Sequence, residues 1–165
     1  MGIEDRLEAL ERRLQTAEYR TEILELLNVY GPLVDSGLAD EAAALWHEGG
    51  GYDIAMPAAR RLEAPQDLAA MYRSPAHTKM IEQGCGHFTA MPSLAIDGDR
   101  AEAVGYTFVA RHGADGWAMW RAAVNHWTLQ RTDAGWRIAE RVNRALDGSP
   151  ASHELMRKVA DFRGR

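Results

Sequence analysis

The chain has 165 residues, a formal net charge of −5 and a single cysteine, Cys85. A chain of this length forms one domain whose core needs no metal or disulfide to fold, and a lone cysteine cannot form an internal bridge. The sequence has no long basic run, no apolar stretch near the roughly 20 residues that cross a bilayer, and a charged rather than signal-like beginning, which argues against nucleic-acid binding and membrane insertion and predicts a soluble cytoplasmic protein.

The first 35 residues predict one long helix, which Gly37 ends. Up to residue 24 its apolar positions alternate in steps of four and three, the spacing of a coiled-coil seam: Ile3, Leu7, Leu10, Leu14, Ala17, Thr21 and Leu24. Farther along, the apolar pattern broadens, as expected where a helix lies on a larger core. Residues 1–24 therefore form a helical extension that either packs on another protomer, in a homodimer or homotrimer, or folds back on its own domain.

Shorter elements are expected between this helix and the main sheet. They are, in chain order, a helix at 40–47 that ends at the three glycines 49–51, a strand at 52–56, a turn at 57–60, a helix opening at Pro65, and a helical stretch from Ser74 to Gly84.

From residue 87 onward the pattern has a period of two, which is typical of strands. Gly-containing turns at 97–99, 113–116 and 133–135 divide it into four strands of an antiparallel meander, at 87–96, 101–112, 117–131 and 136–145. Ser149 and Pro150 then resemble the cap and first turn of a helix at 151–162, within a tail that covers 149–165. Helices followed by a bent antiparallel sheet predict an α+β fold with a concave interior, a common ligand site.

Three stretches, at residues 30–46, 86–101 and 135–141, resemble the SnoaL-like branch of the NTF2-like superfamily. The resemblance extends over about residues 5 to 145. It implies a single domain over 1–165, built as a cone-shaped barrel in which N-terminal helices pack on a curved antiparallel sheet and enclose an apolar pocket.

Within that branch the chain is most similar to scytalone dehydratase, bile acid 7α-dehydratase and hexachlorocyclohexane dehydrochlorinase. These enzymes pair an aspartate near the end of the first helix with a histidine at the start of a sheet strand, and Asp35 and His87 occupy the matching places. Arg141 lies five residues after Trp136, as an arginine does in the dehydrochlorinase, and Tyr30 lies five residues before the aspartate, as a tyrosine does in the bile acid enzyme.

The chain also departs from these enzymes. Near Ala110 the bile acid enzyme has a second acid, and at Met91 the dehydrochlorinase has an asparagine. The residues for proton transfer therefore carry over better than any particular substrate, because a fold of this kind serves many reactions.

The resemblance implies a cofactor-independent lyase of the dehydratase type, acting on a small hydrophobic, polycyclic substrate. Asp35 would orient His87 as the general base, and Arg141 or Tyr30 would assist the leaving group or a developing enolate. No cofactor is implied, and the histidines show no metal-ligand spacing. Large apolar residues are the candidate substrate contacts: Trp46, Met56, Met91 and Trp120.

Each candidate also has a plainer interpretation. Asp35 could be a solvated helix end, His87 a structural histidine, Arg141 a surface charge and Tyr30 part of the helix core. Two other functions also stay open. One is an isomerase or cyclase of a steroid-like or polyketide-like substrate that uses the same Asp–His pair, and the other is a non-catalytic module for binding or assembly.

Overall fold

The computed structural model describes residues 2–55 and 59–162. Its helices are α1 (Ile3–Asp35), α2 (Ala39–Ala43), α3 (Gln66–Tyr72), α4 (Pro75–Gln83) and α5 (Pro150–Arg157), which continues as a 3-10 helix (Lys158–Phe162). Its strands are β1 (Trp46–Ile54), β2 (Arg60–Glu63), β3 (Cys85–Thr89), β4 (Ser93–Asp97), β5 (Arg100–Gly113), β6 (Gly116–Thr132) and β7 (Gly135–Ala145). The α+β order predicted from the sequence is confirmed.

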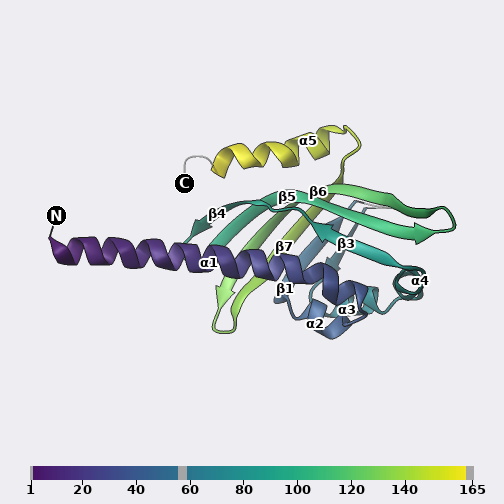
Figure 1. Cartoon of the computed structure of the whole chain (residues 1–165), viewed down its shortest axis with the longest axis horizontal. Coiled ribbons are helices and arrows are strands. Elements are labelled where there is room, and N and C mark those ends of the chain that lie inside the picture. Colours follow the sequence, from purple (N-terminus) through teal and green to yellow (C-terminus); the bar gives the residue numbers. More distant parts are fainter. Residues whose placement is uncertain (1, 56–58, 163–165) are drawn as a thin grey trace.

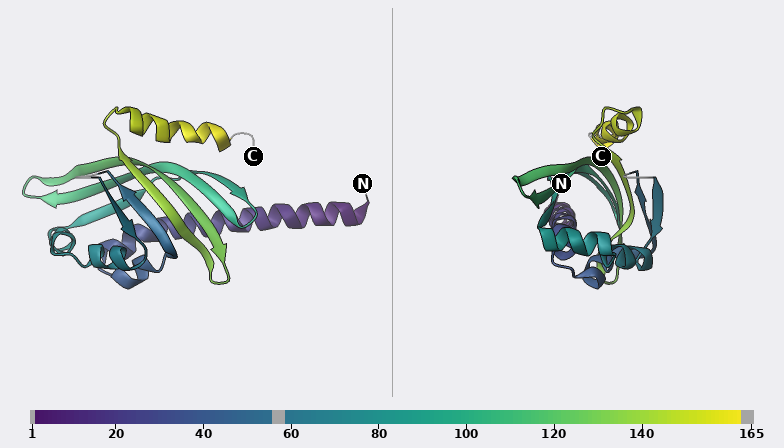
Figure 2. Two further views of the ribbon diagram at one scale, coloured as in Figure 1. Left: turned by 180° about the vertical axis from the view of Figure 1, so that it is seen from behind. Right: turned by 90° about the vertical axis from the view of Figure 1, so that its right-hand side faces the viewer.

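The strands of these two ranges form one curved, open sheet in the order β2-β1-β7-β6-β5-β3, with β4 also paired to β5 (Figure 1). The three longest strands make the predicted antiparallel meander, and Gly98 turns the β4–β5 hairpin with a φ of 56°. One pair departs from the prediction, because β1 lies parallel to β7. Helices α1 to α4 cover the concave face of this sheet, and α5 lies on the opposite face (Figure 2).

The second predicted helix was too long. α2 ends at Ala43, and Trp46 already begins β1. The three glycines lie inside β1, where the pairing with β7 shifts register between Trp46 and Gly51 and Gly49 takes a φ of 74°. The apolar pattern at residues 40–47 suggests a helix, but its last residues pair as a strand instead. Glycine makes this possible, because it tolerates the backbone angles of the register shift.

Two further predictions were wrong, the turn that was expected to include Arg60 and the single strand at 87–96. Arg60 begins the short edge strand β2 rather than a turn, and such a polar four-residue strand carries little apolar alternation. The single strand expected at 87–96 is divided into β3 and β4, which both pair with β5. The break contains Pro92, which has no N–H for a ladder and packs against Gly105 of β5.

The first half of α1 projects away from the domain (Figure 1). Leu7, Leu10 and Leu14 are exposed there, at 55%, 56% and 60% of their surface. Packing on the domain begins near Tyr19, whose ring meets that of Trp136 at 5.4 Å. The extension does not fold back on its own domain. None of the helices within the described ranges combines the length and apolar character needed to cross a membrane.

Two apolar clusters hold the sheet. The larger lies between its concave face and α1 to α3, with Ile23 of α1, Leu68 of α3 and Trp127 of β6 at its centre. The smaller joins α5 to the outer face, where Leu155 packs with Val104 and Val124. The second half of α1 therefore packs against the concave face of the sheet, where the candidate site lies.

Candidate active site

The predicted pair forms where α1 crosses β3. Asp35 is the last residue of α1 and His87 the third of β3. The two elements approach closely because Gly31 has no side chain, and a Cβ there would clash with the backbone oxygen of His87. Because Gly31 lies one helical turn before Asp35, it sets the distance at which the carboxylate meets the strand.

Asp35 holds His87 at two points. Its Oδ1 lies 2.5 Å from Nδ1 of the ring, and its Oδ2 accepts a hydrogen bond of 2.7 Å from the backbone N–H. The two side chains are 20% and 18% exposed, so neither is a solvated surface group. A carboxylate at Nδ1 fixes the proton there and leaves Nε2 free as a base. His87 lines the pocket described below.

Cys85 completes this cluster from the same strand. Its Sγ lies 3.2 Å from Oδ1 of Asp35 and donates to it. Burial and the neighbouring carboxylate raise the pKa of Cys85 to about 12, so it stays a thiol. Burial also tends to raise the pKa of Asp35, but the hydrogen bonds from the ring and backbone of His87 outweigh burial and hold it below its usual value.

Asp35, Cys85 and His87 are also residue types that can bind a metal ion. One ligand atom from each lies within 4.8 Å of the others. Local spacing could not reveal this set, because Asp35 lies 50 residues before Cys85 in the chain. In the observed arrangement Oδ1 of Asp35 accepts hydrogen bonds from both partners, which accounts for the geometry without an ion.

The pocket beside His87 has a volume of about 320 Å³. It lies between the concave face of the sheet and helices α1, α3 and α4. Its wall is mostly apolar and aromatic, and Tyr30 of the predicted site lines it together with His87 and Arg141. The fold thus brings the four catalytic candidates to one place, since Asp35 lies directly behind His87.

Arg141 is buried, with 5% of its surface exposed, and is no surface charge. Its guanidinium carbon lies 4.6 to 5.5 Å from the ring centres of Tyr52, Tyr30 and Trp127. Nε donates to Oδ1 of Asn125 at 2.9 Å. No acidic side chain pairs with Arg141 among the residues described, so a permanent positive charge faces the pocket without a counter-ion.

A polar network that the sequence analysis missed extends across the sheet from Arg141. Asn125 accepts from Asn143 at 2.7 Å and donates to Thr107 at 2.8 Å, and Asn143 in turn accepts from Arg121 at 2.6 Å. Both asparagines are buried. A signal was present in the sequence, because asparagine is unfavourable in mid-strand and Asn125 alternates in phase with the apolar Trp127.

A β-bulge shapes the mouth of the pocket. In the pairing of β5 with β6, Val109 faces Arg121 and Ala110 faces Met119, so Trp120 is the extra residue. Strict alternation puts Trp120 and Arg121 on opposite faces, yet both line the pocket. Bulges re-aim side chains in this way.

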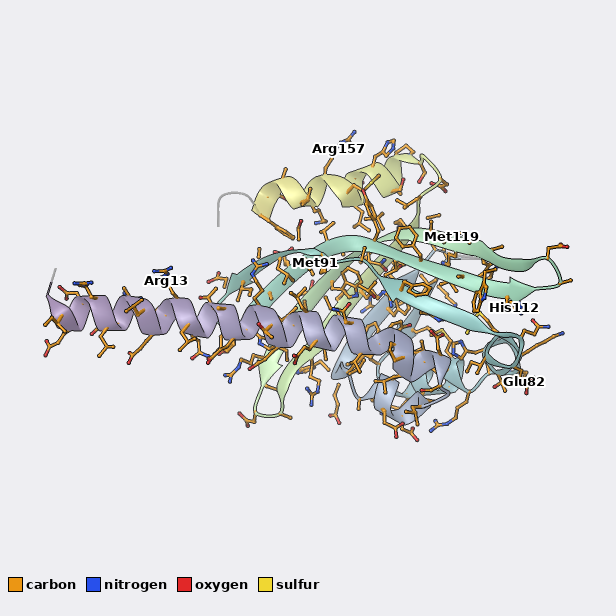
Figure 3. All side chains as sticks on the ribbon, in the orientation of Figure 1. Arg13, Glu82, Met91, His112, Met119 and Arg157 are labelled. Carbon is orange, nitrogen blue, oxygen red and sulfur yellow. The ribbon has the colours of Figure 1, made fainter. Side chains whose placement is uncertain are left out.

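Of the predicted substrate contacts, the pocket contains Trp120. Trp46 is buried in the core against Tyr52, with ring centres 5.5 Å apart, and does not line the pocket. Met91 is 83% exposed and also lies outside it (Figure 3). Met56 lies outside the described residues.

Two further polar groups line the pocket. His77 of α4 lies with its Nε2 3.0 Å from the backbone oxygen of Val34, and its ring centre is 5.9 Å from that of His87. The buried hydroxyl of Tyr72 makes no hydrogen bond of good geometry in the described part of the chain, although it interacts with the hydroxyl of Tyr30. Burial raises the pKa of Tyr72 well above its ordinary value, so this hydroxyl remains a donor.

Comparisons agree with this fold. A family model described as a SnoaL-like domain matches residues 15–142. An NTF2-like protein with a cystatin-like fold from Novosphingobium aromaticivorans is 36% identical, with a TM-score of 0.87 over 94% of this chain and 99% of that chain.

Two more distant structures share the fold. Aln2 from a Streptomyces species is 20% identical, with a TM-score of 0.70 over 79% of this chain and 92% of that one. A variant of Rv3472 from Mycobacterium tuberculosis, a protein of unknown function, is 18% identical, with a TM-score of 0.67 over 86% and 92%. No curated protein sequence matches.

Proposed function

The chain belongs to the SnoaL-like family of the NTF2-like superfamily, and on that premise we propose that it is a lyase that removes water from a hydrophobic cyclic substrate. The family contains many polyketide cyclases and dehydratases. The observation that carries the proposal is the Asp35–His87 pair, whose histidine lines a largely apolar pocket of about 320 Å³.

The proposed reaction begins with proton removal from carbon. Nε2 of His87 takes a proton from the carbon next to a carbonyl, and Asp35 stabilises the imidazolium that forms. The electrons move onto the carbonyl oxygen as an enolate. When these electrons return to carbon, the bond to the β-hydroxyl breaks. The departing oxygen takes the proton from the His87 imidazolium and leaves as water, so His87 is again a neutral base.

Arg141 is suited to stabilise the enolate. Its charge is permanent, is held in place by Asn125 and has no acidic partner among the described residues, so it is available to a developing oxyanion. Tyr30 and Tyr72 also line the pocket, and the hydroxyl of Tyr30 is suited to donate to the departing oxygen.

The same residues also suit an isomerase or cyclase, in which the proton moves but no water is lost. A purely binding module is less well supported, because it has no use for a histidine whose ring is oriented by a partly buried carboxylate.

The experiment uses 3-hydroxy-1-tetralone as a probe, because loss of water gives an enone that tautomerises to fluorescent 1-naphthol. We expect the wild-type protein to accelerate naphthol formation over buffer. His87→Ala and Asp35→Asn should lower the rate by about 100-fold or more, as loss of a general base does.

A second assay separates the lyase from the isomerase. It uses NMR to follow exchange of the C2 hydrogens of 1-tetralone in heavy water. Exchange that depends on His87 without naphthol formation favours an isomerase. Wild-type rates in both variants, or neither reaction in the wild type, would sink the lyase proposal.

A further inference from the structure

The charges around the pocket are all of one sign. Three arginines line it, Arg60, Arg121 and Arg141, whereas no aspartate or glutamate of the described residues does. The carboxylate of Asp35, which lies behind His87, already accepts hydrogen bonds from three donors of β3. This local excess contrasts with the net charge of −5 for the whole chain.

Arg141 is buried at the inner wall and belongs to the proposed reaction, so Arg121 is the arginine that remains to be explained. Its Nη2 donates to Asn143, but its Nε is buried and has no partner in the described part of the chain. A buried donor without a partner costs free energy. No acidic residue is paired with Arg121 in any of the described ion pairs.

We propose that Arg121 makes the pocket specific for substrates that bear a carboxylate. A guanidinium presents parallel N–H groups that match the two oxygens of a carboxylate, and Arg121 lines the pocket without an acidic partner in the described ion pairs. This inference rests on the proposed function, since it takes the pocket beside His87 as the substrate site.

The position of Arg121 fits an anchor for the end of a substrate rather than its reacting centre. It sits at the bulge of β6 next to Trp120, which is 55% exposed and therefore marks the mouth of the pocket. Arg60, also exposed, lies at the rim and donates to the sulfur of Met71. The substrate would thus place its ring system against the apolar wall, with its carboxylate toward the mouth.

The network behind Arg121 fixes its orientation. Asn143 accepts from Arg121 and donates to Asn125, which also accepts from Arg141. The two guanidinium groups are therefore held by one rigid set of buried amides, so that the anchor and the enolate-stabilising charge keep a constant separation.

The test compares 2-naphthoate with 2-naphthamide, which has nearly the same shape without the charge. We expect calorimetric titration at neutral pH to give wild-type protein at least about 10-fold tighter binding of the naphthoate, as a charge-assisted pair predicts. In Arg121→Gln the two affinities should become nearly equal, while the amide binds as before. Arg121→Lys keeps the charge without the fork and should retain only part of the preference.

Arg157→Gln is the matched control, because it removes one positive charge from the exposed side of α5, on the other face of the sheet (Figure 3). It should keep the full preference. Equal wild-type affinities, no naphthoate binding, a preference that survives in Arg121→Gln, or an equal loss of both ligands would overturn the inference.

Binding needs no turnover, so the preference is measured in the wild-type protein whether or not the tetralone probe reacts. If the preference holds and the tetralone probe does not react, the lyase proposal alone fails. If the probe reacts and the preference is missing, only the carboxylate anchor fails.

Discussion

Asp35 stabilises the fold as well as orienting a base, because its carboxylate accepts from the ring and backbone of His87 and from the thiol of Cys85. Those bonds need a charged carboxylate, and they keep the pKa of Asp35 below its usual value even though burial opposes them. A carboxyl whose pKa is lower in the folded state stabilises the protein above its unfolded pKa of about 3.9. This contribution is lost as the pH falls through the folded value.

We therefore expect the free energy of unfolding of the wild type to decrease more steeply than that of Asp35→Asn as the pH is lowered from about 5 to 3. Urea denaturation at several pH values measures both slopes. Asp40→Asn is a control, because Asp40 is an exposed carboxylate paired with Arg73, and such pairs contribute little. Identical slopes for wild type and Asp35→Asn would contradict the role of Asp35 in stability.

The catalytic candidates could be foreseen from the sequence, whereas their surroundings could not. Asp35 and His87 were predicted from the resemblance, because they match the aspartate that similar enzymes have at the end of the first helix and the histidine that they have at the start of a strand. Strict alternation would place Arg121 on the face opposite Trp120, but alternation fails where Trp120 is inserted as a bulge. The buried Asn125 depends on partners from two neighbouring strands, and no local pattern predicts such contacts.

At the scale of elements, the site depends on how closely α1 approaches β3. Gly31 makes this possible, since any side chain at its position meets the carbonyl of His87. Within most helices alanine is more favourable than glycine by about 1 kcal/mol. At position 31 we expect glycine to be more favourable than alanine, because a Cβ there would push away the backbone of His87, which carries the proposed base.

Gly31→Ala should therefore destabilise the protein by about 1 to 3 kcal/mol, the cost of overpacking a core, and reduce turnover of the tetralone probe. The destabilisation is measured by urea denaturation. Asn28→Ala is the control, because Asn28 is exposed on the same helix and alanine favours the helix there. A Gly31→Ala protein as stable and active as the wild type would show that the close approach is unnecessary.

Elements with long, regular patterns were predicted well, and short ones were not. α1 and the three longest strands repeat their periods over many residues. β1 was read partly as a helix, because its start is decided by pairing with β7, far along the chain, and by glycines that take up the shift in register. The polar edge strand β2 is likewise defined by its neighbour β1 rather than by its own composition.

At the scale of the whole molecule, the projecting half of α1 is the feature that one chain alone does not explain. Ile3, Leu7, Leu10 and Leu14 form an exposed apolar stripe at heptad spacing, and a helix segment without tertiary packing is marginal in water. We propose that this stripe pairs with the same stripe of a second or third copy. Because the pocket is formed by residues of one chain, association should stabilise the extension without completing the site.

Replacing Leu7, Leu10 and Leu14 by glutamate should convert a dimer or trimer into a monomer, because like charges then face one another along the seam. Native mass spectrometry and size-exclusion chromatography with light scattering measure the change. The matched control carries Ala9→Glu, Gln15→Glu and Thr16→Glu, which add the same charge outside the seam and should leave the oligomer intact. The monomer should still turn over the tetralone probe, since Asp35, His87 and Arg141 come from one chain. A wild-type monomer would refute the association, and an inactive but folded monomer would mean that a neighbouring copy contributes to the site.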